Sequence, residues 1–269
     1  MRWFLASLML AGVLSAPAAV AESLEAGTDR LSQLHELLAK ATWQRIQPGV
    51  EGLSVVDPQL AELHAYRLAQ KTVQMRMLTA LQPEGSGADQ VGRASNAQLV
   101  INGGYFAFGS GTAMKPTGLL IVDGTTLWPR SGCHACSGVL FADKDGLHID
   151  FAPKIASASG VRSALQVGPL LVHPGGAVGI RSAGGPRAPR SAVCISGNHI
   201  IVLAALSPLT LFELAKLLQA PAEEGGFGCE RAINLDGGPS TQMFVNMPGH
   251  AETLGLPQPV QNFVAFFTR

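Results

Sequence analysis

The sequence predicts an α+β fold: a mixed, strand-rich sheet with few helices, in a single domain. Most apolar runs are short and end at glycine, asparagine or aspartate, which is the pattern of buried strands. Apolar residues recur at helical spacing in only two segments. Hydrophobic residues make up 47% of the 269-residue chain and charged residues 14%, so the composition is that of a packed globular protein and not of a disordered one.

The N-terminus has the pattern of an export signal. Arg2 gives a positive start, residues Trp3 to Val13 are nearly all apolar, and Ala19-Val20-Ala21 offers the small-x-small cleavage pattern. The apolar run is shorter than the roughly 20 residues that a spanning helix needs. We therefore expect residues 1–21 to be a signal peptide, and the mature chain to be periplasmic or secreted, without a membrane span.

Two helices are expected in the mature chain. Leucines at helical spacing over Asp29–Gln44 predict the first, within an N-terminal helical segment of residues 22–48 that precedes a main domain of residues 49–269. The second is predicted at Thr210–Leu218, where Thr210 and Glu213 form a capping box. Glu213 is therefore interpreted as a capping residue and not as a catalytic one.

Between these helices the sequence pattern is that of short strands joined by turns. Asp143–Gly146 lacks the remaining ligands of a calcium loop and is interpreted as a hairpin turn. Pro83–Ala88 and the Gly-, Pro- and Arg-rich Gly175–Pro189 are interpreted as surface loops. Strands are predicted at Leu63–Leu68, Thr72–Leu78, Leu99–Asn102, Gly118–Val122, Val139–Ala142, Leu147–Phe151, Arg190–Val193, Ala232–Leu235 and Val260–Phe267.

The segment Ala232–Thr241 is the strongest candidate for a functional site. An apolar strand ends at Asp236, and two glycines and two hydroxyl residues follow at once. The glycine pair lets the backbone turn sharply or approach a ligand closely, so Asp236 is expected at a strand end beside an accessible loop. Taken alone, the segment also fits an Asp-Gly turn without chemistry.

A second segment repeats this design. Leu99–Phe106 contains an apolar strand, Asn102, two glycines and an aromatic pair. With Val167–Val172, Arg190–Val193 and Ala232–Thr241, in that order, the chain resembles the phosphodiester glycosidase family over roughly Gly52 to Phe267. The resemblance implies a catalytic domain that hydrolyses the glycosidic bond of a sugar-1-phosphodiester, in an envelope or extracellular glycan.

The chemistry of that reaction fits the residues of the motifs. Glycoside hydrolysis usually needs two carboxylates, and the motifs supply one, Asp236. A glycosyl phosphate is less demanding because its leaving group is a stable anion, which needs positive charge more than a proton. Arginine suits this task, since its planar fork binds phosphate oxygens. Asp236 is thus predicted to be nucleophile or general base, and Arg190 to be the catalytic cation.

The remaining predicted site residues would contact the sugar or the phosphate. Asn102 and Asn234 would bond sugar hydroxyls or orient Asp236, although both also fit a role in satisfying buried backbone. Tyr105 would stack on the sugar, or belong to the core. Arg181 and Arg187 are interpreted as solvated loop residues. The predicted substrate-binding residues are Asn102, Gly103, Gly104, Tyr105, Lys115, Arg162, Asn234, Gly237, Gly238, Ser240 and Thr241.

The four cysteines are interpreted as disulfides because export leads to an oxidising compartment. Cys133 and Cys136 have CxxC spacing, for which a local disulfide is preferred over a redox or metal role or unpaired thiols. Cys194 and Cys229 flank two of the family motifs, and a bond between them would tie the corresponding strands together. No cofactor and no metal are predicted.

The formal net charge is zero, which gives no global electrostatic reason to bind nucleic acid or an anionic membrane. The predicted partner is a sugar-phosphate small molecule or an envelope polysaccharide. Two alternatives stay open: a non-catalytic envelope protein that binds a glycan or a partner, and metal-assisted attack at phosphorus.

Overall fold

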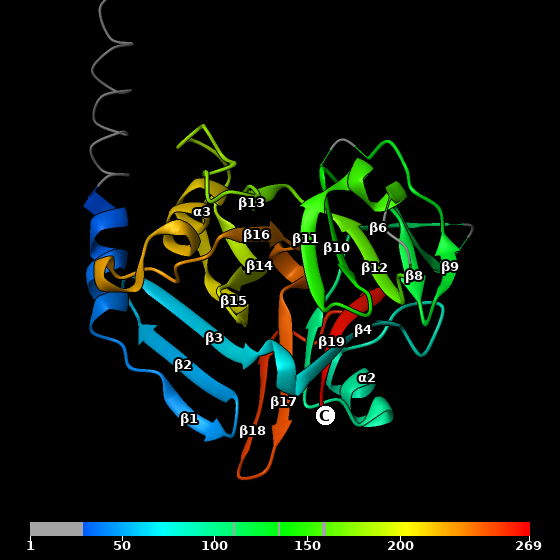
Figure 1. Cartoon of the computed structure of the whole chain (residues 1–269), viewed down its shortest axis with the longest axis horizontal. Coiled ribbons are helices and arrows are strands. Elements are labelled where there is room, and N and C mark those ends of the chain that lie inside the picture. The colour runs from blue at the N-terminus through cyan, green and yellow to red at the C-terminus, as the bar shows by residue number, and fades with distance from the viewer. Residues whose placement is uncertain (1–28, 110, 134, 158–159) are drawn as a thin grey trace, which may run out of the picture.

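The structure is a computed structural model that describes residues 29–109, 111–133, 135–157 and 160–269 (Figure 1). The predicted signal peptide, residues 1–21, lies outside the described residues. The chain is rich in strands and has few helices, which confirms the predicted α+β class. The strands form three larger sheets and a two-stranded ribbon, and the neighbouring strands pair antiparallel.

The largest sheet has seven strands in the order β1-β2-β3-β15-β14-β16-β13. Two five-stranded sheets have the orders β11-β10-β12-β8-β9 and β18-β17-β5-β19-β4, and β6 pairs with β7. The strands are β1 Gln44–Gln47, β2 Val50–Asp57, β3 Ala61–Ala69, β4 Val73–Thr79, β5 Leu99–Asn102, β6 Phe106–Phe108, β7 Met114–Pro116, β8 Leu120–Val122, β9 Thr125–Trp128, β10 Gly138–Ala142, β11 Leu147–Phe151, β12 Ser163–Val167, β13 Leu170–Val172, β14 Ala188–Ser196, β15 His199–Leu209, β16 Arg231–Asn234, β17 Gln242–Met247, β18 His250–Gly255 and β19 Asn262–Thr268.

The helices are few and short. One runs over residues 29–39 of the described chain. The other two α-helices are α2 Ala88–Ser95 and α3 Leu211–Gln219, and the 3-10 turns are η1 Gln70–Thr72, η2 Ala152–Ser157, η3 Ala222–Glu224 and η4 Gly238–Ser240. Thr210 caps α3 with the predicted capping box, in which its side chain accepts from the Glu213 N–H. The role predicted for Glu213 is therefore confirmed.

The seven-stranded sheet is apolar on both faces. Because successive side chains of a strand point to opposite faces, Ala192 and Cys194 of β14 pack with the helices, and Val193 packs with the other sheets. The helical side holds Leu34 from the first helix and Leu214 from α3. The opposite side joins residues of all three larger sheets into one core. In Figure 1 the first helix and α3 lie at one end of the molecule, away from β8 and β9.

Helix α2 and the hairpin β17–β18 are among the elements that were not predicted. Helix α2 follows the segment that was interpreted as a loop, and it packs Val91 against Val100 and Phe244. The hairpin β17–β18 begins directly after the Asp236 motif. Tyr66 of β3 links this hairpin to the seven-stranded sheet, because its hydroxyl lies 2.6 Å from His250 Nε2 and donates to Glu252.

Both predicted disulfides are present. Cys133 is bonded to Cys136, and Cys194 of β14 is bonded to Cys229, two residues before β16. No free cysteine occurs among the residues that the structure describes.

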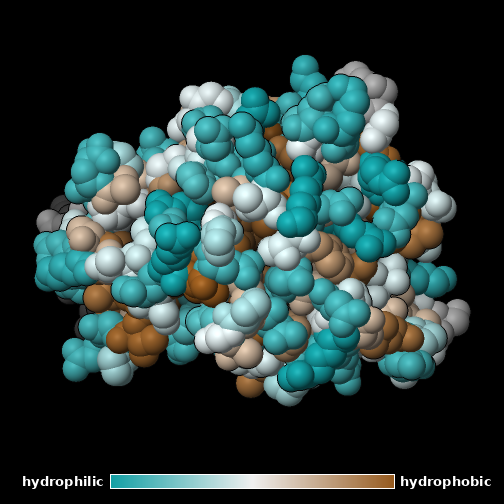
Figure 2. Space-filling view, turned by 60° about the horizontal axis from the view of Figure 1, so that its bottom comes forward, coloured by the Kyte–Doolittle hydropathy of each residue, from teal (hydrophilic) through white to brown (hydrophobic). Residues whose placement is uncertain are grey.

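The surface face in Figure 2 is mainly hydrophilic, with small, separate apolar areas. Within the described ranges, no helix has the length and apolar character needed to cross a membrane.

Candidate active site

The two glycine-containing motifs meet where strands of different sheets end. The Asp236 N–H, just after β16, donates to the Gly103 carbonyl at 2.9 Å. Asn102, the last residue of β5, donates from Nδ2 to the Asp236 carbonyl at 2.7 Å. Two hydrogen bonds therefore fix the backbone of Asp236 between the seven-stranded sheet and the β5 sheet.

The side chain of Asn102 forms hydrogen bonds to other parts of the protein. Its side chain is fully buried, and its Oδ1 accepts from Ser191 Oγ at 2.6 Å and from the Gln242 N–H at 3.2 Å. Together with the bond to Asp236, the amide therefore joins β5, β14 and β17. Of the three roles weighed for Asn102, the geometry favours satisfaction of buried backbone and orientation of Asp236 over contact with a sugar.

Gly103 and Gly104 are needed for close packing. A Cβ on Gly103 would lie 2.1 Å from Asn262 Oδ1, and one on Gly104 would lie 3.0 Å from Leu165 Cδ1. The Gly104 N–H donates to Asn262 Oδ1 at 2.7 Å. Both glycines are buried, so they let Asn262 and the β5 end come together beneath Asp236.

Asp236 is partly buried in the folded chain. Its Oδ1 accepts from the Gly237 N–H at 2.9 Å. Burial raises the pKa of this carboxyl above its usual range, and hydrogen bonds from the Ser240 side chain and the Gly237 backbone oppose that rise. A carboxylate with a raised pKa accepts a proton more readily than a solvated one, which suits a general base.

The turn after Asp236 needs both of its glycines. A Cβ on Gly237 would lie 2.9 Å from the Pro189 carbonyl, and Gly238 has a φ of +59° in open space. The turn leads into η4, which buries Ser240 and Thr241. Thr241 is 2% exposed, and its Oγ1 has no hydrogen-bond partner among the described residues.

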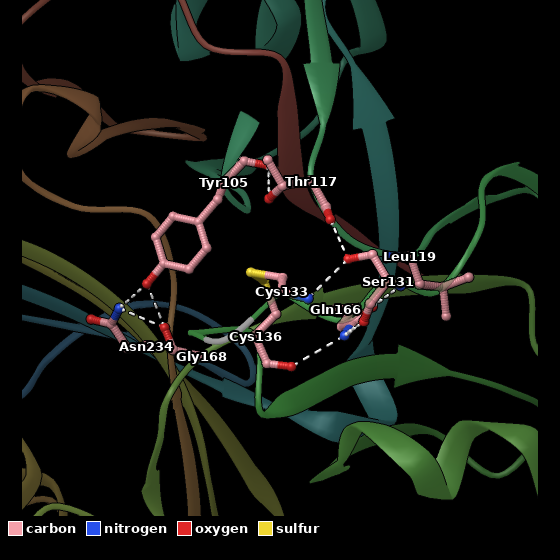
Figure 3. Close-up of a disulfide and its surroundings, with 9 residues drawn as sticks. All are labelled: Tyr105, Thr117, Leu119, Ser131, Cys133, Cys136, Gln166, Gly168 and Asn234. Carbon is pink, nitrogen blue, oxygen red and sulfur yellow. Dashed lines mark hydrogen bonds between the residues drawn. A yellow bond between two sulfur atoms is a disulfide. The ribbon is translucent and has the colours of Figure 1, made fainter. Parts of the chain in front are cut away.

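Tyr105 and Asn234 form a second layer around the motif (Figure 3). The Tyr105 hydroxyl donates to the Gly168 carbonyl at 2.5 Å, and Asn234 Nδ2 donates to the same hydroxyl at 3.2 Å. Burial raises the pKa of Tyr105, and the negative charge of Asp236 adds to that shift. The tyrosine is therefore a fixed, neutral neighbour of Asp236. Asn234 Oδ1 is buried and has no partner among the described residues.

The Cys133–Cys136 loop supports this layer from outside (Figure 3). Gln166 Nε2 donates to the Cys136 carbonyl at 3.2 Å and to the Ser131 carbonyl at 2.9 Å. A Cβ on Gly168 would lie 2.7 Å from the Ala135 carbonyl. The loop thus packs directly on the residue that holds the Tyr105 hydroxyl.

Arg190 lies beside the turn, since a Cβ on Gly237 would lie 3.7 Å from its Cδ. Its Nε donates to the Leu209 carbonyl at 2.9 Å, and its Nη2 donates to the Pro186 carbonyl at 2.6 Å. Burial lowers the pKa of Arg190, and the nearby Tyr105 opposes this effect. Two nitrogens of the fork are therefore used to hold backbone, and Nη1 has no such bond within the described chain.

The other predicted cations are Lys115 and Arg162. Lys115 is exposed on β7, and the N–H of Thr117, two residues later, donates to the Tyr105 carbonyl. Arg162 precedes β12, at the opposite end of that strand from Gly168. It lines a small hollow of about 50 Å³ with Gln70 and other residues outside the motifs. The structure therefore does not bring Arg162 to Asp236.

Arg187 is exposed, as expected for a loop residue, and it also forms an ion pair. Its Nη1 donates to the buried Glu213 Oε2 at 2.7 Å, and Glu213 also lies 3.5 Å from Arg30 Nε. Arg187 and Arg30 therefore share the single negative charge of Glu213.

A groove of about 640 Å³ adjoins the motif and was not predicted. Its residues come from four separate parts of the chain, and no local pattern marks them as neighbours. They are Arg187, Ala188, Pro189, Leu206, Gly238, Pro239, Thr241, Gly255 and Leu256.

Comparison with solved structures supports the fold. The chain matches the zebrafish N-acetylglucosamine-1-phosphodiester alpha-N-acetylglucosaminidase catalytic domain, auto-inhibited by its pro-peptide, with a TM-score of 0.62 and 16% identity, covering 85% of this chain and 87% of that one. It also matches a Synechocystis protein (TM-score 0.54, 16% identity, 85% and 64% covered) and a Burkholderia pseudomallei protein named as exported (0.53, 14%, 80% and 75%).

No curated protein matches the sequence. The family model for phosphodiester glycosidases, in contrast, matches residues 95–267, a range that begins just before β5 and ends within β19. It therefore includes Asn102, Tyr105, Arg190 and Asp236, the residues that meet at the site. The chain belongs to the phosphodiester glycosidase family.

Proposed function

We propose that this protein is an exported hydrolase that cleaves the glycosidic C–O bond of a sugar-1-phosphodiester in an envelope or extracellular glycan. The observation that carries the proposal is the setting of Asp236: a partly buried carboxylate of raised pKa, fixed between two sheets, with Arg190 beside Gly237, the next residue. Membership of the phosphodiester glycosidase family supports the reaction class.

The reaction consumes one water. The water oxygen bonds to the anomeric carbon, the bond from that carbon to the bridging oxygen breaks, and the phosphate monoester leaves with the bridging oxygen and the electron pair. Asp236 serves as general base or as nucleophile, and one proton of the water is released to solvent. Either role leaves the water oxygen on the sugar.

A single carboxylate suffices because the leaving group is already an anion. What stabilises it is a preorganised positive charge, which Arg190 supplies through Nη1, together with the Gly238 N–H, since the Gly237 N–H already donates to Asp236 Oδ1. Lys115, Ser240 and Thr241 are proposed to contact the phosphate or the sugar, and Tyr105 to border the sugar. Asn102, Gly103, Gly104 and Asn234 hold these groups in position.

The test is hydrolysis of a panel of sugar-1-phosphodiesters in oxygen-18 water, with and without chelator. We expect the label in the released sugar and none in the phosphate, and we expect Asp236→Asn to lose most turnover while the protein stays folded. Label in the phosphate would establish attack at phosphorus. Saturable binding of a diester without any turnover would favour the non-catalytic glycan-binding alternative.

Export is proposed from the N-terminal pattern, with support from the two disulfides and from the similar fold of the exported Burkholderia pseudomallei protein. Cleavage after Ala21 leaves Glu22 as the first residue of the mature protein. N-terminal sequencing of the exported protein tests this, and a chain that retains residues before Ala19 would contradict it.

A further inference from the structure

The groove described above shares its residues with the site. Gly238, Pro239 and Thr241 belong to the turn and strand entry that follow Asp236, and residues 187–189 directly precede Arg190. Leu206 of β15 and Leu256, which follows β18, complete the wall. With a volume of about 640 Å³, the groove is in the range of small-molecule sites.

The wall of the groove is mostly hydrocarbon. Leu206 is partly buried against the core, and Leu256 is 66% exposed, so an occupant would cover it. Pro189, Pro239 and Ala188 add further apolar surface. The cation at the edge, Arg187, is paired with Glu213 at 2.7 Å, a carboxylate that Arg30 also contacts at 3.5 Å. A polar alcohol such as a second sugar would find few hydrogen-bonding groups here.

One polar atom of a residue that lines the groove lacks a hydrogen-bond partner among the described residues. Thr241 Oγ1 is buried and has no hydrogen bond among the described residues, although its residue lines the groove. A buried hydroxyl without a partner is costly, and a ligand oxygen at this position would satisfy it. The groove therefore combines one polar group near the motif with an apolar wall, which suits a chain that is polar at one end only.

We infer that this groove binds the alcohol portion of the substrate phosphodiester, and that this alcohol is a hydrocarbon chain of the alkyl or isoprenoid class. The inference rests on the proposed function: with the sugar at Asp236 and the phosphate at Arg190, the alcohol extends past residues 187–189 into the groove. Its ester oxygen end meets Thr241, and its hydrocarbon covers Leu206 and Leu256.

The test uses a series of diesters with the same sugar-1-phosphate and with methyl, butyl or octyl alcohols, below their micelle concentrations. Full burial of a methylene corresponds to about a fourfold gain in affinity, and an open groove is expected to realise about twofold for each methylene. We therefore expect kcat/KM to rise at least tenfold from the butyl to the octyl diester.

The octyl-to-methyl ratio of kcat/KM is compared within each variant, because this ratio does not depend on the fraction of active protein. Leu256→Asn is expected to lower the ratio severalfold. Leu81→Asn is the matched control, because Leu81 is 51% exposed and lies outside the groove, and it is expected to keep the wild-type ratio. Turnover that is equal for all three alcohols would overturn the inference and leave the proposed function standing. A panel without any turnover would overturn the proposed function, and the inference with it.

Discussion

Replacing Asn102 by alanine is expected to destabilise the fold and to impair the site together. The substitution removes three hydrogen bonds: one to the Asp236 carbonyl, one from Ser191 Oγ and one from the Gln242 N–H. The Ser191 hydroxyl can rotate, but the Gln242 N–H is buried and keeps no such partner. With two backbone groups losing their partner at about 1–3 kcal/mol each, we expect a loss of about 3–4 kcal/mol in the free energy of unfolding.

Urea denaturation measures this loss directly, and for a chain of this size it corresponds to a fall in Tm of roughly 6–16 °C. Asn246→Ala is the matched control, because Asn246 is exposed on β17 of the same sheet, and its effect should stay within about 0.5 kcal/mol. A loss below about 1 kcal/mol for Asn102→Ala would refute the view that this amide joins the three strands. So would an unchanged kcat/KM toward the sugar-1-phosphodiester that the wild type hydrolyses best.

Three further predictions concern the site and its frame. Burial raises the pKa of Asp236 in the folded chain, so the ionised carboxylate lowers stability as the pH rises through that pKa, and this cost is absent below the pKa of the unfolded chain. Asp236→Asn should therefore raise Tm at pH 7 and have no such effect near pH 3. Thermal scans at both pH values measure this difference. Replacing both Cys194 and Cys229, whose bond spans 35 residues, by alanine should lower the free energy of unfolding by about 4 kcal/mol in denaturant titrations. The same change at Cys133 and Cys136 should lower it by less than half of that. Equal losses would contradict the loop-length argument. Arg190→Lys should lower kcat/KM more than tenfold, since lysine cannot hold two carbonyls and a phosphate at once, whereas Arg181→Lys on the exposed segment should not change it.

The sequence predicted the parts of the site that are local in the chain. The strand ending at Asp236, its two glycines and the Arg190 strand all lie within short motifs, because a strand end and a tight turn are specified by neighbouring residues. The position of the predicted accessory cation Arg162 could not be predicted in this way. Proximity in sequence says little about which end of a strand faces the site, and Arg162 lies at the far end of β12.

The groove and helix α2 illustrate what local patterns miss. Leu206 and Leu256 become neighbours only through the sheet topology, so no spacing rule connects them. In α2, Gly92 opposes helix propensity, yet a Cβ there would lie 2.2 Å from the Phe244 ring. The close packing of α2 on Phe244 requires a glycine here, whereas the sequence alone marks Gly92 as unfavourable in a helix.

The bonds that hold Asp236 have a consequence for the order of folding. Asn102 is 134 residues from Asp236, 89 from Ser191 and 140 from Gln242 along the chain. Contacts of such long sequence separation form slowly, since a large loop must close, at a cost in chain entropy, before the contacts can stabilise the chain. A nascent or partly folded chain that has built only one of the two sheets has no assembled carboxylate site. Hydrolytic competence should consequently arise late, after the β5 strand docks on the β14–β16 pair, and a refolding experiment should show activity returning after most of the strand signal.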